Sequence, residues 1–119
     1  MMDLGTVLEY CRKKKGVIED FPFDDTTLTL RIGRRIFLLT DIHSNPLRVN
    51  LKCDPLIALD LRDEFSSVVP GYHMNKVHWN TVTLDGSIPV DRVLWMIDHS
   101  YEMVLSKLRK RDRERILYE

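Results

Sequence analysis

The side chains best suited to chemistry gather in the middle of the chain, in the segment 70–82, PGYHMNKVHWNTV. Its aromatic, imidazole and amide residues are Tyr72, His73, Asn75, His78, Trp79 and Asn80, and Lys76 lies among them. Aromatic rings stack on bases, and basic or amide groups hydrogen bond to bases and phosphates. The segment therefore predicts a recognition hairpin. A second interpretation, the commoner case for a tryptophan, is that Trp79 packs in the core and the polar groups hold a kinked hairpin in shape.

Catalytic and metal sites need residues at defined spacings, and here such residues are scattered. The residues of metal-ligand type that come into question are Cys53, His73, His78, Asp98 and His99. The two central histidines have no third ligand at a recognisable spacing. Asp98, His99 and Ser100 are consecutive in a predicted helix, where side chains fan out by about 100° each, so they cannot form a triad. We expect no enzyme activity, no metal and no cofactor, and we expect His99 and Ser100 to meet the sheet edge or the central hairpin.

The charge balance restricts the partners that the chain can bind. It has 18 basic and 18 acidic residues, a formal net charge of zero, among 119 residues of which 44% are apolar. This composition is typical of one globular domain with a real core. A nucleic-acid binder usually carries a basic excess, so DNA binding here requires segregated charge. Residues 12–15 are all basic, and six basic and two acidic residues lie between Lys107 and Arg115; their simplest interpretation is solvated helix ends.

The two cysteines and the N-terminal segment bear on location. Cys11 and Cys53 stand outside any CxxC pair, so we expect free thiols and no disulfide framework. The N-terminal segment lacks the pattern of a signal peptide, and no run approaches the roughly 20 apolar residues of a membrane span. We therefore expect a cytoplasmic protein with no membrane partner.

Periodicity predicts eight elements in the order α-β-β-β-α-β-β-α. A helix is expected at about residues 3–15, followed by strands at 27–32, 35–40 and 47–52. Asp54-Pro55 should start a second helix, ending near residue 65, because aspartate caps free N–H groups and proline suits the first turn. A hairpin over 68–84, turning at Asn75-Lys76, and a long helix from Pro89 to about residue 108 follow.

This order predicts an α+β protein, a two-layer α/β sandwich in which an antiparallel sheet carries its helices on one face. We expect a single domain, 1–119, with a charged extension at about 109–119. By alternation, Arg31, Arg48, Asn50 and Lys52 should point away from the helices. Three of these four are basic, and with Lys76 they would contact phosphates without reading the base sequence. The alternative is a face that serves only solubility.

Three blocks make the chain resemble the MmcQ/YjbR family of small bacterial proteins. They are Lys52-Cys53-Asp54-Pro55, the central segment 70–82 with the following Leu84-Asp85-Gly86, and Ile97-Asp98-His99-Ser100-Tyr101. The resemblance extends from about residue 10 to 108. It implies the same order of elements, a fold related to that of secretion chaperones and likened to double-wing DNA-binding domains.

The function that this resemblance implies is DNA binding without catalysis. Two alternatives stay open at this point. One is a protein-interaction or chaperone-like module, which would bind another protein or a second copy of itself. The other is a protein that binds a metal or a small ligand.

Overall fold

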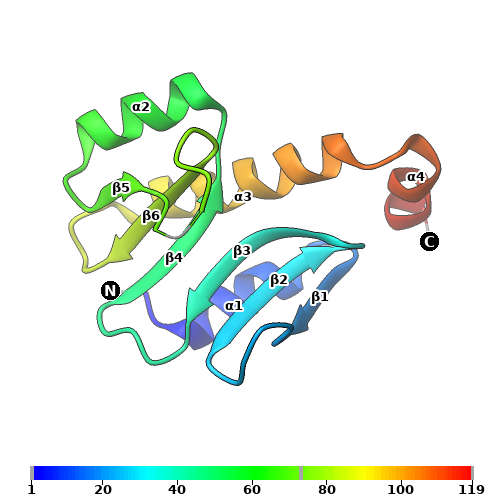
Figure 1. Ribbon diagram of the computed structural model, residues 1–119, viewed down its shortest axis with the longest axis horizontal. Coiled ribbons are helices and arrows are strands. Elements are labelled where there is room, and N and C mark those ends of the chain that lie inside the picture. Colours follow the sequence, from blue (N-terminus) through cyan, green and yellow to red (C-terminus); the bar gives the residue numbers. More distant parts are fainter. Residues whose placement is uncertain (1, 73, 119) are drawn as a thin grey trace.

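A six-stranded antiparallel sheet forms the centre of the molecule (Figure 1). The computed structural model describes residues 2–72 and 74–118. Its helices are α1 (Leu4–Arg12), α2 (Pro55–Glu64), α3 (Val90–Lys107) and α4 (Lys110–Tyr118). Its strands are β1 (Val17–Asp20), β2 (Thr27–Ile32), β3 (Arg35–Asp41), β4 (Leu47–Lys52), β5 (Val68–Pro70) and β6 (Trp79–Leu84). The strands lie in the order β1-β2-β3-β4-β6-β5, and the predicted α+β class is confirmed.

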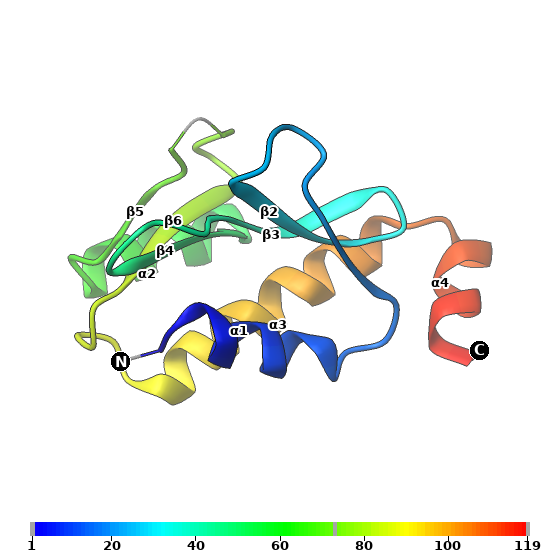
Figure 2. The same cartoon turned by 90° about the horizontal axis from the view of Figure 1, so that it is seen from below.

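The sheet has one packed face and one open face. Helices α1 and α3 lie on the same side of the sheet, below it in Figure 2. Along β4, Leu47, Val49 and Leu51 belong to the hydrophobic core. Because side chains alternate along a strand, Arg48 and Asn50 point to the opposite side. We call that side the open face.

Strand β1 is an addition to the predicted order. It follows Gly16, whose φ of 77° lies in the left-handed region that suits glycine. The strand pairs with β2 from Val17↔Ile32 to Asp20↔Thr29 and forms one edge of the sheet. Its four residues are too few to show the alternation by which β2 and β4 are predicted from the sequence.

Helix α4 is the second addition and occupies the expected charged extension. None of its residues is buried, so the sequence has no apolar stripe that would reveal a helix. Two tertiary contacts hold it: Lys15 Nζ donates to the Leu117 carbonyl at 2.7 Å, and Ile116 packs on Gly16. A Cβ atom on Gly16 would lie only 2.8 Å from Ile116 Cγ2, so this close contact requires glycine.

Ser100 on α3 completes the pairing of β3 with β4. The ladder between these strands runs from Leu38↔Leu51 to Thr40↔Val49 and then stops. One position further on, the fully buried Ser100 hydroxyl donates to the Phe37 carbonyl at 2.5 Å and accepts from the Lys52 N–H at 2.9 Å. The hydroxyl thus replaces the missing rung and ties α3 to the middle of the sheet, whereas the sequence placed its contact at the sheet edge or the central hairpin.

The neighbours of Ser100 fasten α1 to the same helix. Asp98 accepts from the Tyr10 hydroxyl at 2.7 Å and from Lys14 Nζ at 2.5 Å. Burial and the Asp98 hydrogen bond raise the pKa of Tyr10 to about 12, so the phenol stays a donor at neutral pH. The Tyr101 hydroxyl donates to the Lys15 carbonyl at 2.6 Å. Asp98 and Tyr101 are three residues apart and lie on the same face of α3, so both contact the segment 10–15.

We expect the substitution Ser100→Ala to lower the free energy of unfolding by about 2–3 kcal/mol, because it leaves the Phe37 carbonyl and the Lys52 N–H buried without partners. Urea denaturation would measure this loss as a lower midpoint at unchanged slope. The matched control is Ser106→Ala, also on α3, whose exposed hydroxyl only donates to the Met103 carbonyl; its cost should be about 0.5 kcal/mol or less. Equal costs for the two variants would contradict the proposed bridge.

Candidate nucleic-acid interface

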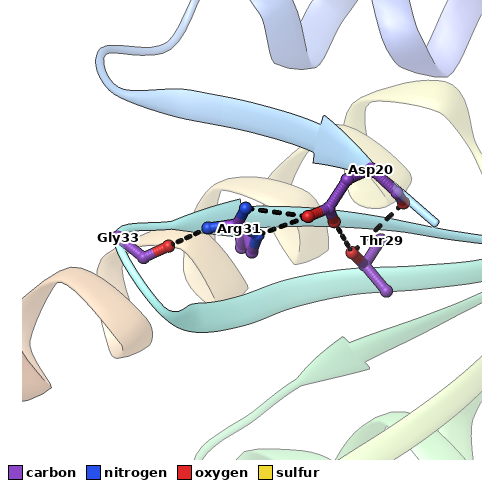
Figure 3. A network of polar contacts seen from close by, with 4 residues as sticks. All are labelled: Asp20, Thr29, Arg31 and Gly33. Atoms are coloured by element: carbon purple, nitrogen blue, oxygen red, sulfur yellow. Dashed lines mark hydrogen bonds and ion pairs between the residues drawn. The ribbon is translucent and has the colours of Figure 1, made fainter. Parts of the chain in front are cut away.

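Arg31, one of the predicted phosphate contacts, is engaged within the protein (Figure 3). Its Nη2 and Nε atoms donate to Asp20 Oδ2 at 2.7 and 3.0 Å, and its Nη1 donates to the Gly33 carbonyl at 2.5 Å. Asp20 also accepts from the Thr29 hydroxyl at 2.6 Å. The hydrogen bonds from Arg31 hold the pKa of Asp20 below its usual value. Arg31 therefore fastens β1 to β2, and its charge is offset by the neighbouring carboxylate.

Two predicted residues of the open face, Arg48 and Asn50, differ in their contacts. Asn50 is buried; its Oδ1 accepts from the Thr81 hydroxyl at 2.6 Å and its Nδ2 donates to the Leu39 carbonyl at 3.1 Å. The Arg48 side chain is exposed and makes no hydrogen bond or ion pair with any residue that the structure describes. Arg48 is thus free to meet a ligand, whereas Asn50 supports the strands.

Lys52, at the end of β4, is half-buried and lies in a positive field. Its pKa is lowered, first by desolvation and then by the positive charges of Arg35 and Lys107. Lys52 therefore lies close enough to Arg35 and Lys107 to feel their charge, and its backbone pairs with Trp79 of the central hairpin.

The central hairpin is held by Arg62 of α2. Its Nε atom donates to Asn80 Oδ1 at 2.7 Å, and its Nη2 atom donates to the carbonyls of Lys76 and Trp79. Lys76 Nζ folds back onto the Gly71 carbonyl at 3.2 Å. Asn80 is buried and Trp79 half-buried. The contacts of Lys76, Trp79 and Asn80 are those of a hairpin held in shape, which is the second of the two interpretations of this segment.

The remaining residues of the hairpin are divided between turn and surface. Asn75 Oδ1 accepts from the Val77 N–H at 2.9 Å and shapes the predicted turn. The side chains of Tyr72 and His78 are exposed. His73, which was also a predicted recognition residue, lies outside the described residues. Among the described residues of the hairpin, Tyr72 and His78 are thus exposed side chains that could contact a ligand.

A group of exposed basic side chains gathers where α4 meets the turn between β2 and β3 (Figures 1 and 2). These residues, which we call the basic end, are Arg34, Arg35, Lys107, Arg109 and Arg115. They line an open hollow of about 960 Å³ in which Asp112 is the one acidic residue among those that the structure describes. Arg109 Nε lies 3.7 Å from Asp112 Oδ2, a solvated pair that leaves a strong positive excess.

Sequence reasoning does not find the basic end, although each of its parts carries a local signal. Gly33-Arg34 reads as a turn and residues 107–115 as a charged extension. The two segments are more than seventy residues apart, and the end of α3 beside Gly33 and the docking of α4 on Gly16 bring them together. Arg62 is also missed, because it lies on α2 and its partners lie on the central hairpin.

The candidates for acid–base chemistry and nucleophilic attack are held in structural roles. His99 Nε2 accepts from the Asp54 N–H at 3.1 Å, and the imidazole stacks on Trp95 with ring centroids 4.9 Å apart. His99 thus hydrogen bonds to the start of α2, whereas the sequence placed its contact at the sheet edge or the central hairpin. Cys11 and Cys53 are buried, and burial raises their thiol pKa values to about 12 and about 11, so both stay protonated at neutral pH.

The described residues contain neither a cluster of metal ligands nor a helix that could span a membrane. Among residues 2–72 and 74–118, no three His, Cys, Asp or Glu side chains are grouped so that they could hold a metal ion. Over the same residues, no helix is both long and apolar enough to span a bilayer.

The fold and its helix-to-sheet contacts define a small α+β protein built on one antiparallel sheet. The chain belongs to the YjbR family, whose model, described as YjbR, matches residues 12–103. It is 32% identical over 113 residues to the uncharacterized protein YjbR of Escherichia coli K12, which covers 95% of this chain and 96% of that protein. It is also 36% identical over 117 residues to the uncharacterized protein YyaQ of Bacillus subtilis 168, covering 87% and 98%. The resemblance seen in the sequence is confirmed.

Solved structures share this architecture. The crystal structure of Deinococcus radiodurans protein DR2400, with a domain described as DUF419, superposes with a TM-score of 0.93 at 38% identity, covering 100% of this chain and 91% of that one. A crystal structure of a Pseudomonas syringae protein superposes with a TM-score of 0.73 at 24% identity, covering 87% and 99%, and shows the fold alone. The first match includes the whole chain, α4 among its elements.

The stability of the protein should depend on pH through His99. Burial lowers the pKa of His99 from its ordinary value of 6.5, so the unfolded chain takes up this proton at a higher pH than the folded chain does. The stability contributed by neutral His99 is therefore present above about pH 6.5 and is lost as the pH falls below it. We expect the free energy of unfolding to fall between pH 7 and about 5, as measured by urea denaturation.

The variant His99→Gln tests the assignment, because an amide oxygen can accept from the Asp54 N–H but does not titrate. It should flatten the pH dependence in this window. The control His43→Gln replaces an exposed histidine and should keep the wild-type slope. Parallel slopes for all three proteins would rule out His99 as the group responsible.

Proposed function

We propose that this protein binds DNA through the basic end, without catalysing a reaction. The observation that carries the proposal is the gathering of five exposed cationic side chains around one hollow in a chain whose net charge is zero. A neutral chain can bind a polyanion only where its positive charge is concentrated. Guanidinium groups, four of the five here, suit phosphate because they can donate two parallel hydrogen bonds.

The rest of the charge distribution supports this orientation. Asp60 and Asp63 are exposed on α2, and Asp91 is exposed at the start of α3. Helix α2 lies toward the opposite end of the molecule from α4 (Figure 1). Such a charge dipole would steer the basic end toward phosphate and turn the acidic end away. Contacts of this kind position the protein on the duplex and do not read its sequence.

The proposal moves the interface away from most of the residues first predicted. Arg31 is offset by Asp20, and Lys76 folds onto its own hairpin. Lys52 keeps its predicted role, since it lies in the positive field of Arg35 and Lys107. The proposed binding takes place in the cytoplasm and needs no metal or cofactor.

A second candidate function is a protein-interaction module, which would bind another protein or a second copy of the chain. Leu56 and Leu59 of α2 expose 74% and 57% of their surface, and Trp95 of α3 exposes 44%. Exposed apolar side chains of this size are common at interfaces. Static light scattering separates the possibilities: a stable dimer that Leu56→Gln and Leu59→Gln together abolish would favour the interaction module.

DNA binding is tested by titrating a fluorescent duplex at several salt concentrations. The double variant Arg34→Gln/Arg115→Gln should make the negative slope of log K, the binding constant, against log salt shallower by about 2, because each lost phosphate contact removes roughly one unit. The matched control, Lys13→Gln/Arg48→Gln, removes two exposed cations outside the basic end and should leave the slope unchanged. No binding by the wild type at low salt, or equal losses in both double variants, would overturn the proposal.

A further inference from the structure

A second recessed site lies on the open face, far from the contacts that hold the helices. It has a volume of about 390 Å³, within the range of small-molecule pockets. Two loops form its walls: residues 21–26 between β1 and β2, and the described residues 71, 72 and 74–78 between β5 and β6. Figure 2 shows both loops rising from the sheet on the side opposite α1 and α3. The basic end has no residue in common with this pocket.

One end of the pocket floor carries two opposite charges. In the register of β3 and β4, Leu39 pairs with Asn50 and Thr40 with Val49, so the next position along sets Asp41 opposite Arg48. Both side chains are exposed and both line the pocket. They form no ion pair with each other or with any other residue in 2–72 and 74–118.

In the middle of the pocket floor, the polar side chains of Asn50 and Thr81 are already hydrogen bonded within the protein. The Asn50 and Thr81 side chains hydrogen bond to each other at 2.6 Å, and the Thr81 hydroxyl also accepts from the Tyr72 N–H at 2.9 Å. Asn50 Nδ2 is satisfied by the Leu39 carbonyl. Polar recognition in the pocket therefore falls to the charged groups of Asp41 and Arg48.

The walls and the rest of the floor offer apolar surface. Phe23 and Tyr72 stand on the two loops and expose 66% and 67% of their surface. Met74 and Leu39, both half-buried, line the pocket with them. A ligand that covered these side chains would remove apolar area from water, worth roughly 25 cal/mol per Å².

We propose that this pocket binds an α-amino acid with an aromatic or large aliphatic side chain. The carboxylate would receive paired hydrogen bonds from the Arg48 guanidinium, and the ammonium group would bind the Asp41 carboxylate. The apolar side chain would lie over Leu39 between Phe23 and Tyr72. One cation beside one anion matches a zwitterion, whereas a ligand with a phosphate group would face the uncompensated charge of Asp41.

The binding is measured by isothermal titration of the whole chain with L-phenylalanine, and in parallel by the rise in Tm that a ligand of the folded state causes. We expect saturable binding of L-phenylalanine and L-leucine. The analogues 3-phenylpropanoate and 2-phenylethylamine each lack one charge and should bind at least about tenfold more weakly, since each leaves one protein charge unpaired. No binding of either amino acid, or 3-phenylpropanoate binding as tightly as L-phenylalanine, would overturn the proposal.

Variants locate the site. Arg48→Gln and Asp41→Asn should each weaken L-phenylalanine binding at least about tenfold, and Phe23→Ala should weaken it while leaving the analogues in the same order. The control Arg34→Gln removes an exposed arginine of the basic end and should bind L-phenylalanine as the wild type does. Unchanged binding in Arg48→Gln would contradict the assignment. DNA binding tests different residues, so either proposal can fail without the other.

Discussion

The structure depends on one buried hydroxyl. Ser100 donates to the Phe37 carbonyl and accepts from the Lys52 N–H where the β3–β4 ladder stops, so α3 is joined to the sheet by hydrogen bonds as well as by apolar packing. Of the two residues before Ser100, Asp98 accepts from Tyr10 of α1 and His99 accepts from the Asp54 N–H at the start of α2. Because helical residues fan out by about 100°, three consecutive polar side chains fasten three different parts of the fold.

This arrangement decides which surfaces remain for function. The side of the sheet that faces α1 and α3 is filled by the core. Ser100 and His99, the polar residues there, hydrogen bond to backbone groups. Binding chemistry is left to the open face and to the end of the molecule where α4 docks. These two surfaces differ in charge. The basic end concentrates positive charge and suits a polyanion, whereas the open-face pocket has one cation, Arg48, and one anion, Asp41, and suits a small ligand of zero net charge.

Much of the fold could be predicted because the signals are local. The stripe of α3, the Asp54 cap with Pro55, the alternation along β2 and β4 and the apolar run of β3 each follow from residues within one element. The hairpin over 68–84 follows from its turn residues, and Asn75 does shape that turn. The strand β1 and the helix α4 escaped prediction because one is too short to alternate and the other has no buried face.

The sequence by itself determined the α+β class, the family and the direction in which Arg48 and Asn50 point, since periodicity and motif depend only on neighbours along the chain. The tertiary structure alone decided what each charge does. Arg31 meets Asp20 across two strands, Arg62 crosses from α2 to the central hairpin, and Arg34 comes beside Arg115 through the docking of α4. Charge pairing depends on distance in space, and no pattern along the chain encodes that distance.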